Sequence, residues 1–149
     1  MRFSLNRALG PADVCRVRTL PPILVVDNDP LVREVLGEAL RHDFEVRFAT
    51  SGEAALAALL VDPPVAMLLD FDLADGDGYQ VLEERRRRRL APTTRVVMLS
   101  ARDDERAVVR SWVLGADSHL AKPIDPDHIS AWLRTLLEAG VPARTPSRA

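Results

Sequence analysis

Five short apolar runs, separated by roughly helix-sized intervals, constrain the fold of this chain most strongly. They cover residues 23–26, 44–48, 65–69, 96–99 and 118–121, and each has the length of a strand. Most are almost continuously hydrophobic, which suits a parallel sheet buried on both faces, whereas 44–48 alternates with charged residues as an edge strand does. The pattern predicts an α/β fold, a (βα)5 doubly wound parallel sheet with helices on both faces.

Capping signals mark three helix starts between these runs. Asp29-Pro30 and Asp125-Pro126 read as an N-cap followed by proline at the first helical position. Thr50 and Glu53 have the spacing of a capping box. One domain therefore spans residues 21–139, and we expect the N-terminal extension (1–20) and the C-terminal tail (140–149) to be loose.

Composition and charge exclude several classes of protein. A net charge of -2 gives no general drive toward nucleic acid or membrane. Cys15 is the only cysteine, so no internal disulfide can form, and a reducing cytoplasm is the expected compartment. The longest apolar run, 54–61, is far too short to span a bilayer. We predict a cytoplasmic protein without nucleic-acid or membrane partners.

Polar residues follow four of the five apolar runs. The first run is followed by Asp27-Asn28-Asp29, the third by Asp70, the fourth by Ser100 and the fifth by Lys122, which is the only lysine among 20 basic residues. Because ligands bind at the carboxyl ends of parallel strands, these side chains should converge. Clustered carboxylates suit Mg2+, and an aspartate beside it can attack a phosphoryl group whose oxygens Ser100 and Lys122 would hold.

Four motifs in this order resemble the receiver domain of two-component response regulators, over residues of about 21 to 139. They occupy residues 23–29, 68–78, 97–101 and 115–123. The resemblance implies the flavodoxin-like strand order 2-1-3-4-5, Asp70 as phosphoacceptor, and a histidine kinase or phosphotransfer protein as donor. It further implies that Mg2+ is held by Asp27, its neighbour Asn28, Asp70 and the backbone carbonyl of Asp72, that Ser100 and Lys122 contact the phosphoryl group, and that the Lys122-Pro123 peptide is cis.

The chain also departs from the family pattern. Asn28 stands where the family usually has a second acid, which predicts weaker Mg2+ binding. Asp29 is a substitute ligand or, more simply, the N-cap before Pro30. Asp72 adds negative charge near the phosphoryl site. His119 replaces the usual switch aromatic, and comparison with the family puts it with Val108 and Trp112 on an outer face that would dock a partner protein or a second copy of the chain.

Two further features have structural interpretations. The arginine run 85–89 lies at the end of a predicted helix, where cations offset the macrodipole, and no aromatic residues interleave it as in nucleic-acid sites. Arg85 should pack its stem against the sheet while its head reaches water. Trp132 lies in an amphipathic last helix and is expected to serve packing.

Three functions remain open on these observations. The first is a phosphoacceptor that signals by surface contact without an output domain of its own, because the residues after 139 are too few to fold into one. It would not be an enzyme beyond self-phosphorylation from small donors and autodephosphorylation. The second is a degenerate receiver that acts as a phosphorylation-independent interaction module. The third is a small haloacid-dehalogenase-like phosphatase, since Asp70-Phe71-Asp72 matches its Asp-x-Asp signature, although two strands precede that motif here.

Overall fold

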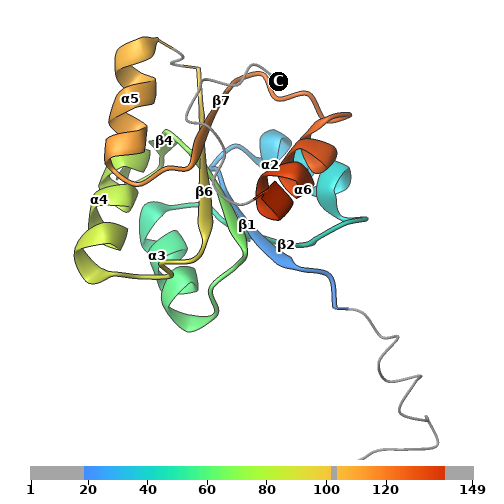
Figure 1. The fold of residues 1–149 in the computed structure, drawn as a ribbon, viewed down its shortest axis with the longest axis horizontal. Helices are drawn as coiled ribbons and strands as arrows, with labels where there is room; N and C mark the ends of the chain where they lie inside the picture. Colours follow the sequence, from blue (N-terminus) through green and yellow to red (C-terminus); the bar gives the residue numbers. More distant parts are fainter. Residues whose placement is uncertain (1–18, 102–103, 140–149) are drawn as a thin grey trace, which may run out of the picture.

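A computed structural model describes residues 19–101 and 104–139, which form a central parallel sheet between two layers of helices (Figure 1). Within this part of the chain the sheet order is β2-β1-β3-β6-β7, with every neighbouring pair parallel. The strands are β1 (Pro22–Val26), β2 (Glu45–Ala49), β3 (Ala66–Asp70), β6 (Arg95–Ser100) and β7 (Ser118–Ala121). This confirms the predicted fold class, the 2-1-3-4-5 order and the edge position of the second strand.

In the described residues, five helices connect and cover these strands. They are α2 (Pro30–Leu40), α3 (Gly52–Val61), α4 (Gly78–Arg88), α5 (Glu105–Val113) and α6 (Ile129–Ala139). A short antiparallel hairpin of β4 (Asp72–Leu73) and β5 (Gly76–Asp77) follows β3 directly. Figure 1 shows α2 and α6 on one face of the sheet and α3, α4 and α5 on the other.

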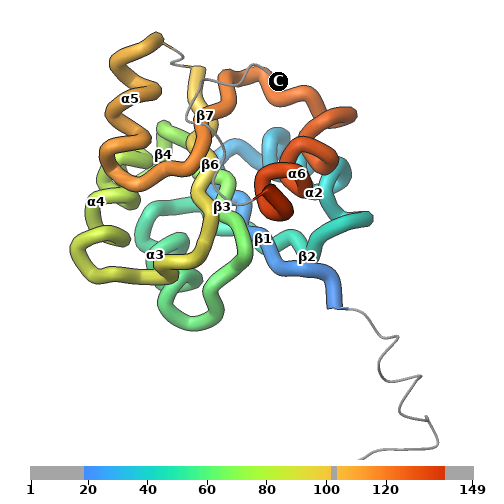
Figure 2. Tube along the Cα trace, viewed as in Figure 1, coloured from blue at the N-terminus to red at the C-terminus, as the bar shows by residue number. Residues whose placement is uncertain are grey.

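The core is split by the sheet into two apolar layers. Successive side chains of a strand point to opposite faces, so Ile23 and Val25 pack in the layer under α2 and α6, whereas Leu24 and Val26 pack in the layer under α3 and α4. Trp132 packs against the α2/α6 layer, as predicted. The tube in Figure 2 shows that β3 runs through the middle of the molecule between β1 and β6. The end of β3 is therefore covered by elements on both sides.

Of the three helix starts predicted from the sequence, the structure agrees with one and differs from two. Asp29 is the N-cap of α2, and its Oδ1 accepts a hydrogen bond from the Leu31 N–H (2.9 Å). The N-cap of α3 is Ser51, whose hydroxyl accepts from the Ala54 N–H (3.1 Å), so the expected capping box at Thr50 was wrong by one residue. The last helix begins at Ile129 rather than Pro126 because Asp125 instead closes a preceding turn, accepting from the Asp127 N–H (2.9 Å).

The arginine run contributes to the fold. Arg85 Nη2 donates to the carbonyl oxygens of Ala91 (3.0 Å) and Thr94 (2.9 Å), so its head binds backbone rather than reaching water as predicted. Arg86 Nη1 donates to the Val113 carbonyl at the end of α5 (2.8 Å), where a cation also offsets the helix dipole. These arginines join α4 to its neighbours. The expectation of no nucleic-acid partner stays a prediction.

Most of the two predicted tails, 1–20 and 140–149, lies outside the described residues, and Cys15 with them. Among the helices that the structure describes, none combines the length and the apolar character needed to cross a membrane.

Gly78, at the start of α4, lies against the end of β3. Its N–H donates to the Phe71 carbonyl (2.7 Å). A Cβ at this position would lie 2.9 Å from the Asp70 carbonyl oxygen, closer than real Cβ atoms approach other atoms, and in a tight contact of 3.1 Å with Met98 Sδ. The absence of a side chain therefore lets α4 begin directly beside the strand end that carries Asp70.

We expect Gly78→Ala to lower the free energy of unfolding by about 1–3 kcal/mol, the usual cost of overpacking a core. Gly37→Ala is the matched control, because its Cβ would meet only the ring of Phe48 (3.0 Å), a half-exposed side chain that can move. Urea unfolding of both variants measures the difference. Equal stabilities would mean that the Gly78 contact can relax without cost.

Candidate functional site

The ends of four neighbouring strands meet at one edge of the sheet. Asp27 follows β1, Asp70 ends β3, Ser100 ends β6 and Lys122 follows β7. The parallel register pairs Val26 with Leu69, Asp70 with Leu99 and Ser100 with Ala121, so these ends are level. The structure brings Asp27, Asp70 and Lys122 into contact, as predicted, and it places Ser100 at the same edge of the sheet.

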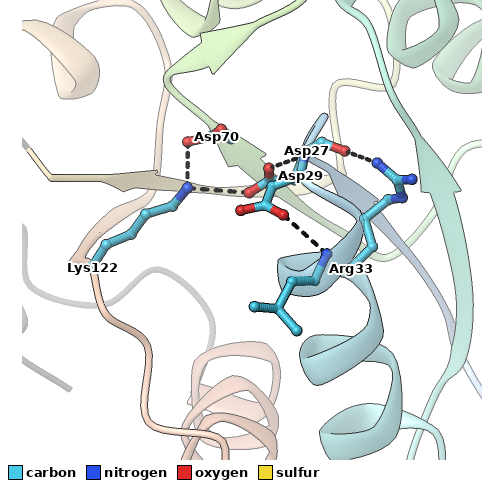
Figure 3. Close-up of polar contacts among 6 residues, drawn as sticks. Asp27, Asp29, Arg33, Asp70 and Lys122 are labelled. Carbon is cyan, nitrogen blue, oxygen red and sulfur yellow. Dashed lines mark hydrogen bonds and ion pairs between the residues drawn. The ribbon is translucent and has the colours of Figure 1, made fainter.

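The ammonium group of Lys122 bridges two carboxylates (Figure 3). Its Nζ lies 2.8 Å from Asp70 Oδ1 and 3.1 Å from Asp27 Oδ2. The Asp27 side chain is 0% exposed and that of Asp70 is 7% exposed, whereas Lys122 keeps 26% of its surface in water. The cluster thus has a buried side, and it opens to solvent at Lys122. The Lys122-Pro123 peptide is cis, as predicted.

Two further contacts hold Asp27 in place. Its Oδ1 accepts from the Asp29 N–H (2.9 Å), and its backbone carbonyl accepts from Arg33 Nη1 (2.8 Å; Figure 3). Arg33 was not predicted from the sequence. The sequence feature that could have indicated this contact is the position of Arg33 one turn into α2, four residues after the N-cap. A long side chain there can reach back to the end of β1.

The charged groups in this cluster shift one another's pKa values. Burial raises the pKa of Asp70 above its ordinary value, with a further contribution from the like charges of Asp27 and Asp72, and Lys122 only partly opposes this. Burial alone would lower the pKa of Lys122, but its contacts with Asp70 and Asp27 outweigh that effect and raise it. Two buried carboxylates share one ammonium, so the cluster carries excess negative charge when both are ionised.

We therefore expect Asp70→Asn to stabilise the protein at pH 7, by on the order of 1 kcal/mol, because it removes a carboxylate whose ionised form is disfavoured by folding. Since the raised pKa penalises only the ionised form, the gain should shrink as the pH falls through the folded-state pKa and vanish below about pH 3, where the acid is neutral in both states. Urea unfolding between these pH values measures it. A loss of stability at pH 7 would show that the Lys122 ion pair outweighs the cost of burial.

The residues present fit a hard divalent cation such as Mg2+. Asp27 and Asp70 supply carboxylate oxygens, and with Lys122 as their shared cation the ionised cluster keeps a net negative charge, which favours a further cation. Within the described residues, however, no group of three or more carboxylate, histidine or cysteine side chains is placed to hold a metal. Asn28, next to Asp27, is exposed and carries a neutral amide, so it adds no carboxylate to this cluster.

Asp29 and Asp72 take other positions. Asp29 caps α2 through Oδ1, which supports the simpler of its two predicted roles. Asp72 lies in β4 opposite Asp77, and its side chain is exposed, although its charge still contributes to the raised pKa of Asp70.

A chain of aromatic contacts leads from the phosphoacceptor candidate to α5. Phe71, directly after Asp70, packs edge-on against Tyr79, with ring centroids 4.9 Å apart. The Tyr79 hydroxyl donates to the Ala107 carbonyl (3.2 Å), and the Arg110 guanidinium lies over the Tyr79 ring at 4.4 Å. This link was not predicted, because nothing in the spacing of Tyr79 indicated contact with α5.

The predicted output face needs correction. Val108 is 1% exposed and His119 is 2% exposed, so neither lies on an outer surface, and Trp112 is partly buried. The reason is the rotation of α5, which begins after the N-cap Asp104 and turns Val108 and Ser111 toward the sheet. The apolar residues that α5 does expose are Val109 (43%) and Val113 (64%).

A family model described as the response regulator receiver domain matches residues 23–134, most of the chain. The chain belongs to the response regulator receiver family. This confirms the resemblance seen in the sequence motifs, and the family that matches is that of receiver domains rather than haloacid-dehalogenase-type phosphatases. The matched residues lie within the predicted domain, 21–139.

Curated relatives and solved structures agree with this assignment. The chain is 34% identical over 116 residues to the probable transcriptional regulator ycf27 of Cyanophora paradoxa, and 31% identical over 116 residues to the transcriptional regulatory protein SrrA of Staphylococcus aureus. Each match covers 77% of this chain and 47% of the relative, so the chain spans about half the length of the curated relatives it matches.

Among solved structures, a putative response regulator from Chloroflexus aurantiacus is 34% identical, with a TM-score of 0.73 over 80% of this chain and 99% of that one. The BeF3-activated receiver domain of DrrB from Thermotoga maritima is 28% identical, with a TM-score of 0.71 over 80% and 99%. Receiver domains generally bind Mg2+ at their acidic pocket and interact with histidine kinases or phosphotransfer proteins.

Proposed function

We propose that this receiver domain accepts a phosphoryl group on Asp70 from a phosphohistidine of a kinase or phosphotransfer protein. The observation that carries the proposal is the position of Lys122, whose Nζ lies 2.8 Å from Asp70 Oδ1 at the solvent-facing side of the carboxylate cluster. A cation in this position can hold a phosphoryl oxygen as readily as it holds the carboxylate. Labelling of the wild type and Asp70→Asn with a small phosphodonor tests the proposal.

The chemistry follows from the cluster. An Asp70 oxygen attacks the phosphorus of the donor, the bond from phosphorus to the imidazole nitrogen breaks, and its electron pair stays on the imidazole, which leaves an acyl phosphate. Lys122 contacts Asp70 before the step and would pair with a phosphoryl oxygen after it. Ser100, buried at the end of the neighbouring strand, is the expected second donor to that group. Bound Mg2+ would neutralise phosphoryl charge, held by Asp27, Asn28, Asp70 and the backbone carbonyl of Asp72.

The donor protein requires a surface beside the cluster, and an apolar groove lies there. It has a volume of about 440 Å3 and is lined by α2 residues and by the segment after β7, including Lys122 itself. Leu31 is 64% exposed and Val35 is 39% exposed, and Pro123 and Ile124 complete the wall. Exposed apolar residues next to a reactive group suit transient protein contact, so we assign the donor to this groove.

For the output we infer a partner that contacts α5 through Val109 and Val113. The inference rests on their exposure and on the contacts from Phe71 through Tyr79 to α5, by which a change at Asp70 can alter the position of the helix. The domain would then act through contact rather than catalysis, with no substrate turnover beyond its own phosphorylation and dephosphorylation. Signalling without an output domain, and location in the cytoplasm, stay predictions.

Asn28 favours one other function, a receiver that binds its partner without phosphorylation. Because a neutral amide replaces an anionic ligand, Mg2+ binding and with it phosphorylation would be too weak to be useful. Partner binding that is equal in the wild type and in Asp70→Asn, together with no label from a small phosphodonor, would support this second function.

A further inference from the structure

Helix α3 lacks the polar outer face that a surface helix normally has. Its ten residues are GEAALAALLV, in which Glu53 is the only charged or polar side chain. Only Gly52, Ala55 and Leu59 are fully buried. Leu60 is 60% exposed and Val61 is 81% exposed. A helix that is apolar all round is usually covered on every side, so the outer face of α3 is expected to be an interface.

A groove runs along this face between α3 and α4. Its volume is about 560 Å3, and one wall is formed by Leu56, Ala57 and Leu60 of α3. The other wall is formed by residues of α4, which are polar or charged except for Val81. The two helices lie side by side in Figure 1 and run in the same direction, since the groove is lined by Gly52 and Asp77 at their starts and by Leu60 and Arg88 at their ends. The groove therefore has the length of a short helix.

Charge is distributed unequally along the groove. Its starting end is acidic, with Glu53, Asp75 and Asp77. At the other end lie Arg88 and Glu84, and the Glu84 carboxylate is already paired with Arg87, which leaves Arg88 as the charge without a carboxylate partner of its own in the groove wall. Asp75 accepts hydrogen bonds from the N–H groups of Gly52 (2.7 Å) and Glu53 (3.0 Å), which lowers its pKa and keeps it ionised. An occupant must therefore present positive charge at the start of α3 and negative charge at its end.

We propose that the occupant is the same face of a second copy of this chain, with the two α3 helices antiparallel about a two-fold axis. Such an axis places the acidic end of the groove in each copy against the basic end in the other. Two equivalent pairs then form across the interface, each between Glu53 of one copy and Arg88 of the other. The axis also packs the exposed apolar residues of one α3 against those of the other. A two-fold interface must be complementary to itself, and this face meets that requirement in its charges and in its apolar residues. The dimer does not depend on phosphorylation of Asp70.

The experiment is sedimentation equilibrium of the full chain over a wide concentration range. The wild type should show a monomer–dimer equilibrium, and Leu60→Glu should abolish the dimer without changing the thermal unfolding temperature, because the side chain it replaces is exposed. Val113→Glu, an equivalent change on the exposed side of α5, should leave the dimer intact. A monomeric wild type, or dissociation by Val113→Glu instead of Leu60→Glu, would overturn the proposal.

A charge exchange tests the orientation of the two copies. Glu53→Arg and Arg88→Glu should each weaken dimerisation several-fold, because each turns two attractive pairs into repulsive ones at an exposed site. The double variant should recover the wild-type dissociation constant, since the pairs are restored with their signs reversed. If the double variant is weaker than either single variant, the antiparallel arrangement is wrong. None of these measurements involves phosphorylation, so their failure is independent of the function proposed for Asp70.

Discussion

Incubation with acetyl phosphate and Mg2+ should label the wild type on Asp70 alone, and Asp70→Asn should abolish the label completely. The reason is the position of this carboxylate, which ends β3 and contacts Lys122 at 2.8 Å, where a phosphoryl oxygen can replace the carboxylate oxygen as the partner of the ammonium group. The product is an acyl phosphate, so hydroxylamine should release it. Asparagine keeps the shape of the side chain but is not a nucleophile.

Asp72→Asn is the matched control for this experiment. Asp72 is the other acid of the Asp-x-Asp sequence, but it is exposed in the β4–β5 hairpin and pairs in register with Asp77. Its side chain can be replaced without changing the backbone carbonyl that is expected to bind the metal. The variant should therefore be labelled like the wild type. Label that persists in Asp70→Asn, or disappears in Asp72→Asn, would place the phosphoacceptor elsewhere and refute the proposed function.

Much of this site could be predicted because a parallel sheet leaves few choices. Once the apolar runs are assigned to parallel strands, the residues directly after them must meet at one edge, so the sequence alone places Asp27, Asp70, Ser100 and Lys122 together. This prediction requires strand boundaries that are correct to within about one residue. Buried strands that are continuously hydrophobic define their boundaries well enough for that. The side-chain distances could not be obtained in this way.

The helical faces were predicted less well, for a physical reason. The apolar residues of α5 include both Val108, which is buried, and its neighbours Val109 and Val113, which are exposed. Hydrophobicity alone does not distinguish these faces, and the rotation of the helix depends on where the chain enters it, at Asp104. The start of α6 was missed because Asp125-Pro126 can form either a helix start or the turn that it forms here. Arg33 and Tyr79 act through tertiary contacts that local spacing does not indicate.

The second large effect that we expect is on Mg2+ affinity, and it comes from giving residue 28 a negative charge. Asn28→Asp should tighten Mg2+ binding at least about tenfold, because two unit charges about 4 Å apart near a protein surface attract by roughly 4 kcal/mol, and tenfold requires only about 1.4 kcal/mol. The margin allows for the cost of placing a third acid near Asp27 and Asp70. Residue 28 is exposed directly after a buried strand end, so the new carboxylate can reach a cation without being buried.

Calorimetric titration of Mg2+ into the wild type and Asn28→Asp measures the difference without any phosphorylation step. Asp72→Asn serves as the comparison, because it changes a carboxylate that lies near the cluster but projects into solvent, and it should alter the affinity much less. If Asn28→Asp binds no more tightly while Asp72→Asn binds clearly more weakly, then Asp72 already supplies the missing charge. In that case the amide at position 28 does not limit the metal site, and the argument for a phosphorylation-independent receiver loses its main support.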